Sequence, residues 1–115
     1  MLPSADPLVT IDLRALGDLL GEDDVAGLRE VVAFFVESFP ILRAQMDEAM
    51  AEKDRGKLRN AAHAAKGAAR NVCAPGLAAI MEKLEASSPR ASWAKLSVLV
   101  TECDAAFADV RQAAQ

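Results

Sequence analysis

The chain has 115 residues, 52% hydrophobic and 26% charged, which suits one domain with one core and excludes a disordered chain. The formal net charge of −4 gives no broad basic footprint, which argues against nucleic-acid binding. Two distant cysteines, Cys73 and Cys103, form neither a metal-ligand spacing nor a disulfide framework. The first residues lack the features of a signal peptide, and charges interrupt the apolar runs. We therefore expect a cytoplasmic protein with reduced thiols and no membrane span.

The N-terminal part is predicted to hold a flexible lead and a short helix. Residues 1–11 contain two prolines and no hydrophobic period, whereas residues 12–113 read as one helical domain. Asp12 is a suitable N-cap for a short helix that Gly21 ends. The acidic run at residues 22–24 predicts a turn and the next N-cap.

Two long helices follow. From Val25 to about Lys53, apolar residues recur at spacings of three and four. Pro40 interrupts this pattern, but the period continues in register across it, so we expect a single kinked helix. Asp54 reads as the N-cap of the next helix, which covers about residues 55–73.

The last two helices are predicted from their proline and serine signals. Pro75 suits a first helical position, and Ser88 and Pro89 suit the N-cap and first turn of the final helix. No segment alternates with the period of a strand. The prediction is an all-α fold, an antiparallel four-helix bundle with a short additional N-terminal helix. A bundle of this size can be monomeric.

The third long helix has two unlike faces. At about 100° per residue, one face is small and apolar. It comprises Leu58, Ala61, Ala62, Ala65, Ala69 and Val72. The opposite face carries the single histidine of the chain, three cations and a glycine: His63, Arg59, Lys66, Arg70 and Gly67.

A lone histidine on a helix surface is most often only a solvated residue, but the glycine and the cations around His63 argue for a functional role. Gly67 lies one turn after His63, in a segment that otherwise uses alanine freely, and a helical glycine costs about 1 kcal/mol against alanine. On a polar face, such a glycine more plausibly clears space for a partner. Lys66, Arg70 and Arg59 share the face and could hold the charge of a phosphoryl group.

Other chemistries find little support in this sequence. One histidine without suitably spaced cysteines offers too few ligands for a metal site. There is no nucleophile elbow for a hydrolase, and no glycine-rich phosphate loop for ATP.

Two segments together match a known pattern. The first is His63-Ala-Ala-Lys66-Gly67-Ala-Ala, and the second is Leu77-Ala-Ala-Ile-Met81-Glu-Lys-Leu84-Glu85. They resemble the histidine-containing phosphotransfer (HPt) domain family, whose pattern is His-x-x-Lys-Gly-small-small and then Leu-x-x-x-Cys-x-x-Leu-Glu/Gln. Two departures are Met81 in place of the frequent cysteine, and Cys73 in place of the usual turn glycine. A redox-sensitive thiol is an alternative role for Cys73, although no neighbour in the sequence argues for a lowered pKa.

The resemblance implies a phosphorelay carrier that is not an enzyme in its own right. His63 would accept a phosphoryl group on its solvent-facing nitrogen and exchange it with the aspartate of receiver domains, of response regulators or hybrid histidine kinases. Glu85 would hydrogen-bond the other ring nitrogen. The chain would bind no cofactor, and the receiver would bring Mg²⁺. Plain solvated charges remain alternatives for Glu85, Arg59 and Arg70.

Docking is expected to use apolar residues near the histidine. Leu13, Leu16, Phe34 and Phe35 are candidates, although core positions are the more probable assignment for most of them. One alternative function is a helical docking or adaptor module that carries no phosphate. Another is a phospho-accepting domain cut from a chemotaxis-type kinase; the initial Met and the short C-terminal tail favour a complete small protein.

Overall fold

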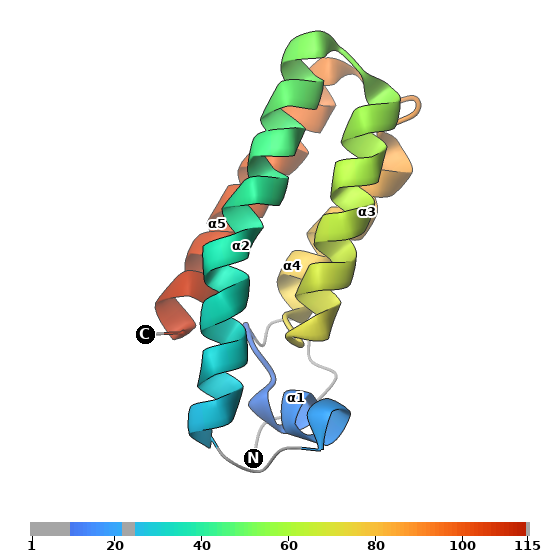
Figure 1. Cartoon of the computed structure of the whole chain (residues 1–115). Coiled ribbons are helices and arrows are strands. Elements are labelled where there is room, and N and C mark those ends of the chain that lie inside the picture. Colours follow the sequence, from blue (N-terminus) through green and yellow to red (C-terminus); the bar gives the residue numbers. More distant parts are fainter. Residues whose placement is uncertain (1–9, 22–24, 115) are drawn as a thin grey trace.

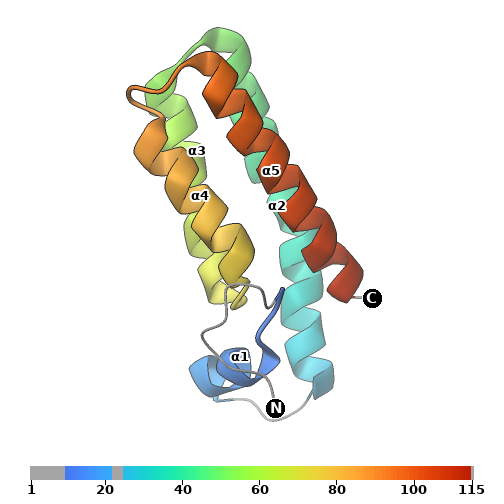
Figure 2. The same cartoon turned by 180° about the vertical axis from the view of Figure 1, so that it is seen from behind.

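The computed structural model describes residues 10–21 and 25–114, and these residues form five helices and no strand. In chain order the helices are α1 (Leu13–Leu20), α2 (Val25–Glu52), α3 (Arg55–Asn71), α4 (Pro75–Ser87) and α5 (Trp93–Ala113). Helices α2 to α5 run up and down side by side, and α1 lies across one end (Figures 1 and 2). The fold is the predicted antiparallel four-helix bundle. Residues 1–9 of the expected lead and the acidic turn at 22–24 lie outside the described residues.

Local signals define most of the helix ends. Asp12 Oδ1 accepts a hydrogen bond from the backbone N–H of Ala15, and Asp54 Oδ1 accepts one from that of Lys57. Gly21 ends α1 in the left-handed conformation with φ of 65°, and Pro75 is the first residue of α4. These four predictions are confirmed.

Helix α2 continues through Pro40 as one element of 28 residues, as the unbroken hydrophobic period predicted. Proline removes one backbone donor, but packing on both sides of it keeps the helix together. Phe39 is 1% exposed and Met46 is fully buried, so the apolar stripe runs past the proline. The long helix therefore reaches from the end covered by α1 to the opposite end of the bundle (Figure 1).

Two predicted boundaries are wrong. The final helix begins at Trp93 with Ser92 as its N-cap, rather than at Ser88 and Pro89. The Ser88 hydroxyl instead donates to the carbonyl of Leu84 at 2.6 Å, so this serine ends α4. Helix α3 ends at Asn71 rather than at Cys73, because Cys73 takes the left-handed conformation with φ of 53°.

Short side chains on α3 bring its neighbours close. The inner face of α3 consists of Leu58, Ala61, Ala62, Ala65 and Ala69, each at most 3% exposed. Larger side chains on α4 fill the space opposite, with Leu77, Met81 and Leu84 buried. Alanine adds little thickness to a helix, so α3 packs closely between α2 and α4. This arrangement leaves the other face of α3, which carries His63, at the surface.

Helix α1 is fastened to the bundle at both its start and its middle. The backbone N–H of Asp12 donates to the carbonyl of Cys73 at 2.8 Å, in the turn between α3 and α4. Leu16 is fully buried and packs with Leu28 and Val32 of α2. These contacts place α1 beside the end of α3 that follows His63.

Candidate functional site

His63 projects from α3 with its side chain 69% exposed. The flanking helix positions explain this orientation, because Ala62 and Ala65 are fully buried and direct the opposite face outward. No reorganisation of the fold is needed for a reacting group to reach the imidazole ring.

Glu85 of α4 meets the ring from the side. Its Oε2 lies 3.0 Å from His63 Nδ1. A carboxylate can only accept a hydrogen bond, so Nδ1 carries the proton and donates. The neutral ring then presents an unprotonated Nε2 with a free lone pair. The structure thus brings together the two residues that the sequence pattern paired.

Lys66 fixes the other oxygen of the same carboxylate. Its Nζ lies 2.7 Å from Glu85 Oε1, and both side chains are largely buried, at 15% and 18% exposure. Oε1 is shielded from solvent, so the ammonium group supplies the compensating charge. The hydrogen bond from Lys66, and more weakly that from His63, holds the pKa of Glu85 below its usual value against the effect of desolvation. Glu85 is therefore a carboxylate at neutral pH.

The two arginines of the face are held less firmly. Arg70 Nη2 lies 3.6 Å from Glu82 Oε1, and both side chains are more than half exposed. Arg59 is exposed and makes no ion pair among the described residues. Arg59 and Lys66 border a shallow pocket with Glu82 and Glu85. Arg59 lies one turn before His63 on α3, and Arg70 lies two turns after it.

Gly67 leaves a gap next to His63. A Cβ atom built on this glycine would meet nothing within 4 Å, and its backbone does not need a positive φ. The fold therefore does not require glycine here. The gap lies between the imidazole and the side of α3 that faces α2.

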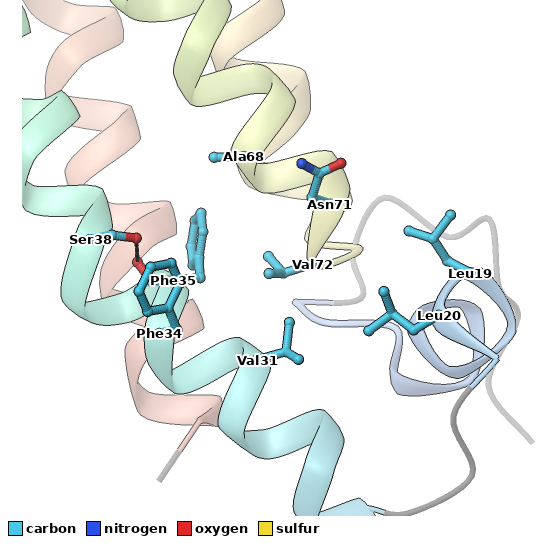
Figure 3. A pocket seen from close by; sticks show the side chains of 9 residues that line it. All are labelled: Leu19, Leu20, Val31, Phe34, Phe35, Ser38, Ala68, Asn71 and Val72. Atoms are coloured by element: carbon cyan, nitrogen blue, oxygen red, sulfur yellow. Dashed lines mark hydrogen bonds between the residues drawn. The ribbon is translucent and has the colours of Figure 1, made fainter.

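An apolar groove opens beyond this gap, between α1, α2 and α3 (Figure 3). It has a volume of about 510 Å³. Its lining residues are Leu19, Leu20, Val31, Phe34, Phe35, Ser38, Ala68, Asn71 and Val72. Phe34 is 71% exposed, and Ile41, two turns further along α2, is 65% exposed, so apolar surface continues past the groove.

The four docking candidates from the sequence divide evenly. Leu16 and Phe35 are core residues, whereas Leu13 and Phe34 are exposed. Sequence reasoning did not single out Leu19 and Leu20, which form the α1 side of the groove. Their only sequence signal is an excess of leucine on a short helix, and the groove arises from where α1 lies.

Neither cysteine is an activated thiol. Burial raises the pKa of the Cys103 thiol to about 12. Burial, and more weakly the charge of Asp12, also raises the pKa of the Cys73 thiol. Thiolate reactivity requires a lowered pKa, so the alternative role of Cys73 as a redox-sensitive thiol is disfavoured.

Among residues 10–21 and 25–114, no group of three or more His, Cys, Asp or Glu side chains could hold a metal ion. No helix in the same part of the chain is both long enough and apolar enough to cross a bilayer.

The sequence matches the model of a known family, and the fold matches a solved structure. The family model of the Hpt domain matches residues 30–113. No curated protein sequence matches the chain. Among solved structures, the crystal structure of histidine-containing phosphotransfer protein B (HptB) from Pseudomonas aeruginosa PAO1 matches with a TM-score of 0.79. The match covers 93% of this chain and 92% of that chain at 24% sequence identity, which shows a shared fold.

Proposed function

The chain belongs to the Hpt domain family, whose members carry phosphoryl groups between receiver domains and kinases of two-component systems, and we propose that His63 is its phosphoryl-accepting residue. The observation that carries this proposal is the contact of 3.0 Å between Glu85 Oε2 and His63 Nδ1. It leaves Nε2 unprotonated in the neutral ring, on an exposed side chain.

The transfer step follows from this geometry. The Nε2 lone pair attacks the phosphorus of an aspartyl phosphate on a receiver, and the bond between phosphorus and the aspartate oxygen breaks. The aspartate leaves as a carboxylate with that electron pair. The Nδ1 proton stays in place, so the ring becomes positively charged as the N–P bond forms. The Glu85 carboxylate stabilises this charge, because it lies within hydrogen-bond distance of Nδ1.

The remaining residues of the face have supporting roles. Lys66 keeps Glu85 charged and oriented through their contact of 2.7 Å. Arg59 and Arg70 lie close enough along the same helix face to offset the added phosphoryl charge. The receiver supplies Mg²⁺ and the aspartate, and this chain supplies a positioned imidazole, so it acts as a carrier in the cytoplasm and not as an independent enzyme.

We assign the docking of the receiver to the groove bordered by Leu20, Phe34 and Asn71. Three features support this assignment: the groove is apolar, it is exposed, and one of its lining residues is Ala68, which directly follows Gly67. A receiver seated there could reach the imidazole across the gap that the glycine leaves. Binding by apolar area with charges at the rim is the usual composition of a protein interface.

The carrier proposal is tested by phosphate uptake. The wild-type chain, incubated with Mg²⁺ and receivers phosphorylated in vitro, should acquire acid-labile phosphate, and the His63→Gln variant should acquire none. Equal labelling of the variant would refute the assignment of His63. If neither protein takes up label from any receiver but both bind one, the chain is a docking module.

A further inference from the structure

Lys53, Arg55, Ser88, Ala91 and Trp93 form a cluster at the end of the bundle remote from α1, which we call the end clasp. Arg55 Nη1 donates hydrogen bonds to the carbonyl oxygens of Ser88 at 3.0 Å and Ala91 at 2.6 Å. The Arg55 guanidinium also lies over the Trp93 ring, 4.6 Å from its centroid, and Lys53 Nζ lies 5.1 Å from it. One arginine at the start of α3 therefore contacts Ser88, Ala91 and Trp93 in and beside the connection between α4 and α5.

The end clasp contacts the residues that follow the last turn of α4. The carbonyl groups at the end of a helix lack partners within the helix, and Arg55 supplies donors to two that follow this turn. Ser88 is fully buried, and both its backbone N–H and its hydroxyl bond to the carbonyl of Leu84. Leu84 directly precedes Glu85 in α4. The carboxylate that orients His63 thus sits one turn before the point that Arg55 holds.

Helices α3 and α4 are held together by packing and by the ion pairs of Lys66 with Glu85 and of Arg70 with Glu82, and the end clasp adds a contact at the end of the pair. The inward surface of α3 is mostly alanine, so the larger side chains on this contact come from α4. The two helices are joined covalently only at residues 72–74. The end clasp closes the other end of this hairpin. His63 and Glu85 meet between the covalent turn and the clasp, about 12 Å along α3 from Arg55.

We propose that Arg55 is a positioning residue for the phosphoryl-accepting histidine, because it sets the axial position of α4 and so keeps Glu85 in contact with His63. Arg55 does not touch the reacting atoms. Its effect on transfer rests on the proposed function of His63, but its effect on the contact between Glu85 and His63 does not.

The test compares Arg55→Ala and Arg55→Lys with wild type, and uses Arg43→Ala as a matched control. Arg43 also ties two helices together, through Asp104 of α5 at 2.6 Å, but it lies on α2, away from the α3–α4 pair. Two quantities are measured well below the unfolding temperature. One is the distribution of the ring proton between Nδ1 and Nε2 of His63, from ¹⁵N NMR; the other is the single-turnover rate of transfer from a phosphorylated receiver.

In Arg55→Ala, the His63 proton should shift from Nδ1 toward the distribution of free histidine. The transfer rate at saturating receiver should fall by about tenfold, since small displacements of reacting groups are costly. Arg55→Lys keeps a donor for the carbonyls and should recover part of both effects. Arg43→Ala should lower the unfolding temperature and leave both quantities unchanged.

The proposal is wrong if Arg55→Ala keeps the wild-type ring proton distribution, whatever its stability. It is also wrong if Arg43→Ala changes that distribution as much. Should Arg55→Ala fail to fold, Arg55→Lys decides by the same two measurements. A wild-type chain that takes up no phosphate refutes the function of His63, and the NMR comparison still tests the end clasp.

Discussion

The two carboxylate oxygens of Glu85 contact two different side chains. Oε2 faces the imidazole and Oε1 faces the ammonium group of Lys66. A carboxylate facing only a histidine could rotate or take up a proton, and the ion pair with Lys66 opposes both. In this structure the lysine of the His-x-x-Lys-Gly pattern is thus paired with the acid that contacts the ring.

Gly67 is the residue whose role can be separated most cleanly from folding. Gly67→Gln should increase the free energy of unfolding by about 0.5 kcal/mol, because glutamine is the better helix former and the site is open. It should also slow transfer by about tenfold, because a long side chain fills the approach to His63. Urea titration and single-turnover transfer assays measure the two effects.

Gly67→Ala is the matched control for this prediction. Its single methyl group meets nothing within 4 Å, so the variant should be stabilised by about 1 kcal/mol with a transfer rate near that of wild type. A Gly67→Gln variant that is less stable than wild type but transfers normally would show that the glycine serves the fold.

Most residues near His63 could be predicted from the sequence, because the helix period determines which residues of one helix share a face. His63, Lys66, Gly67 and Arg70 share a face by the helix period alone. Glu85 lies on another helix, and only the family pattern paired it with His63. The end clasp of Arg55 could not be predicted, because its partners are backbone carbonyls in a loop, which carry no sequence signal.

At the scale of the elements, α1 and α2 shape the groove as much as α3 does. Leu19 and Leu20 come from α1, Val31 and Phe34 from α2, and Ala68 and Asn71 from α3 (Figure 3). On α3 the lining residue nearest to His63 in the sequence is Ala68. A partner seated in the groove would contact all three helices.

Phe34 tests the groove as a docking surface. Phe34→Ser should weaken receiver binding by about tenfold, since exposed aromatic residues often dominate interface energy. It should change the free energy of unfolding by less than about 0.5 kcal/mol, because the side chain is 71% exposed. Binding is measured by titration of a receiver that accepts phosphate from the chain, and stability by urea titration.

Val98→Ser is the corresponding control. Val98 is 56% exposed but belongs to α5, which does not line the groove. An equal loss of affinity in both variants would argue that the receiver docks elsewhere. Normal binding by Phe34→Ser would give the same answer.

The element boundaries show where local signals suffice. Asp12, Asp54 and Pro75 each act within three residues, so their helix starts were predictable. Ser88 and Ser92 are both plausible caps, and local pattern could not choose between them. The choice follows from tertiary contacts. Ser88 is buried and its own carbonyl accepts a hydrogen bond from Arg55, so the loop lies before Ser92.

At the scale of the whole molecule, we expect the free energy of unfolding to decrease at acidic pH, because two glutamates that pair with lysines become protonated. Hydrogen bonds from Lys66 and Lys57 hold the pKa values of Glu85 and Glu48 below their ordinary value of 4.5. A carboxylate whose pKa falls on folding adds stability above its unfolded pKa, and this stability is lost as the pH falls through the folded pKa.

The urea concentration at the midpoint of unfolding should therefore decrease between about pH 5 and about pH 3. The decrease should be smaller in Glu85→Gln, whose amide does not titrate in this range. Circular dichroism at a series of pH values measures both curves. Parallel curves would show that the ion pair between Lys66 and Glu85 adds nothing to global stability.

The arrangement of the helices in a bundle could be predicted from the sequence, whereas the groove on its surface could not. Hydrophobic periods determine which face of each long helix is buried, and α2 to α5 follow them. For α1, the hydrophobic period does not predict burial correctly. Leu13 and Leu20 share the spacing of Leu16, yet they are 40% and 47% exposed. Helix α1 has eight residues and lies across one end of the bundle, so only one side of it contacts the core. Its position therefore determines which of its leucines are buried and which are exposed.

The openness of His63 has a consequence for timing. With 69% of its side chain exposed, a phosphorylated ring would stand in bulk water, and no described side chain covers it. The N–P bond to an imidazole releases free energy when it is cleaved, so transfer to a receiver is favourable, and an exposed group is also open to attack by water. The chain would hold its signal for only as long as uncatalysed hydrolysis permits. The output of such a carrier would depend on how quickly the next receiver arrives relative to that hydrolysis.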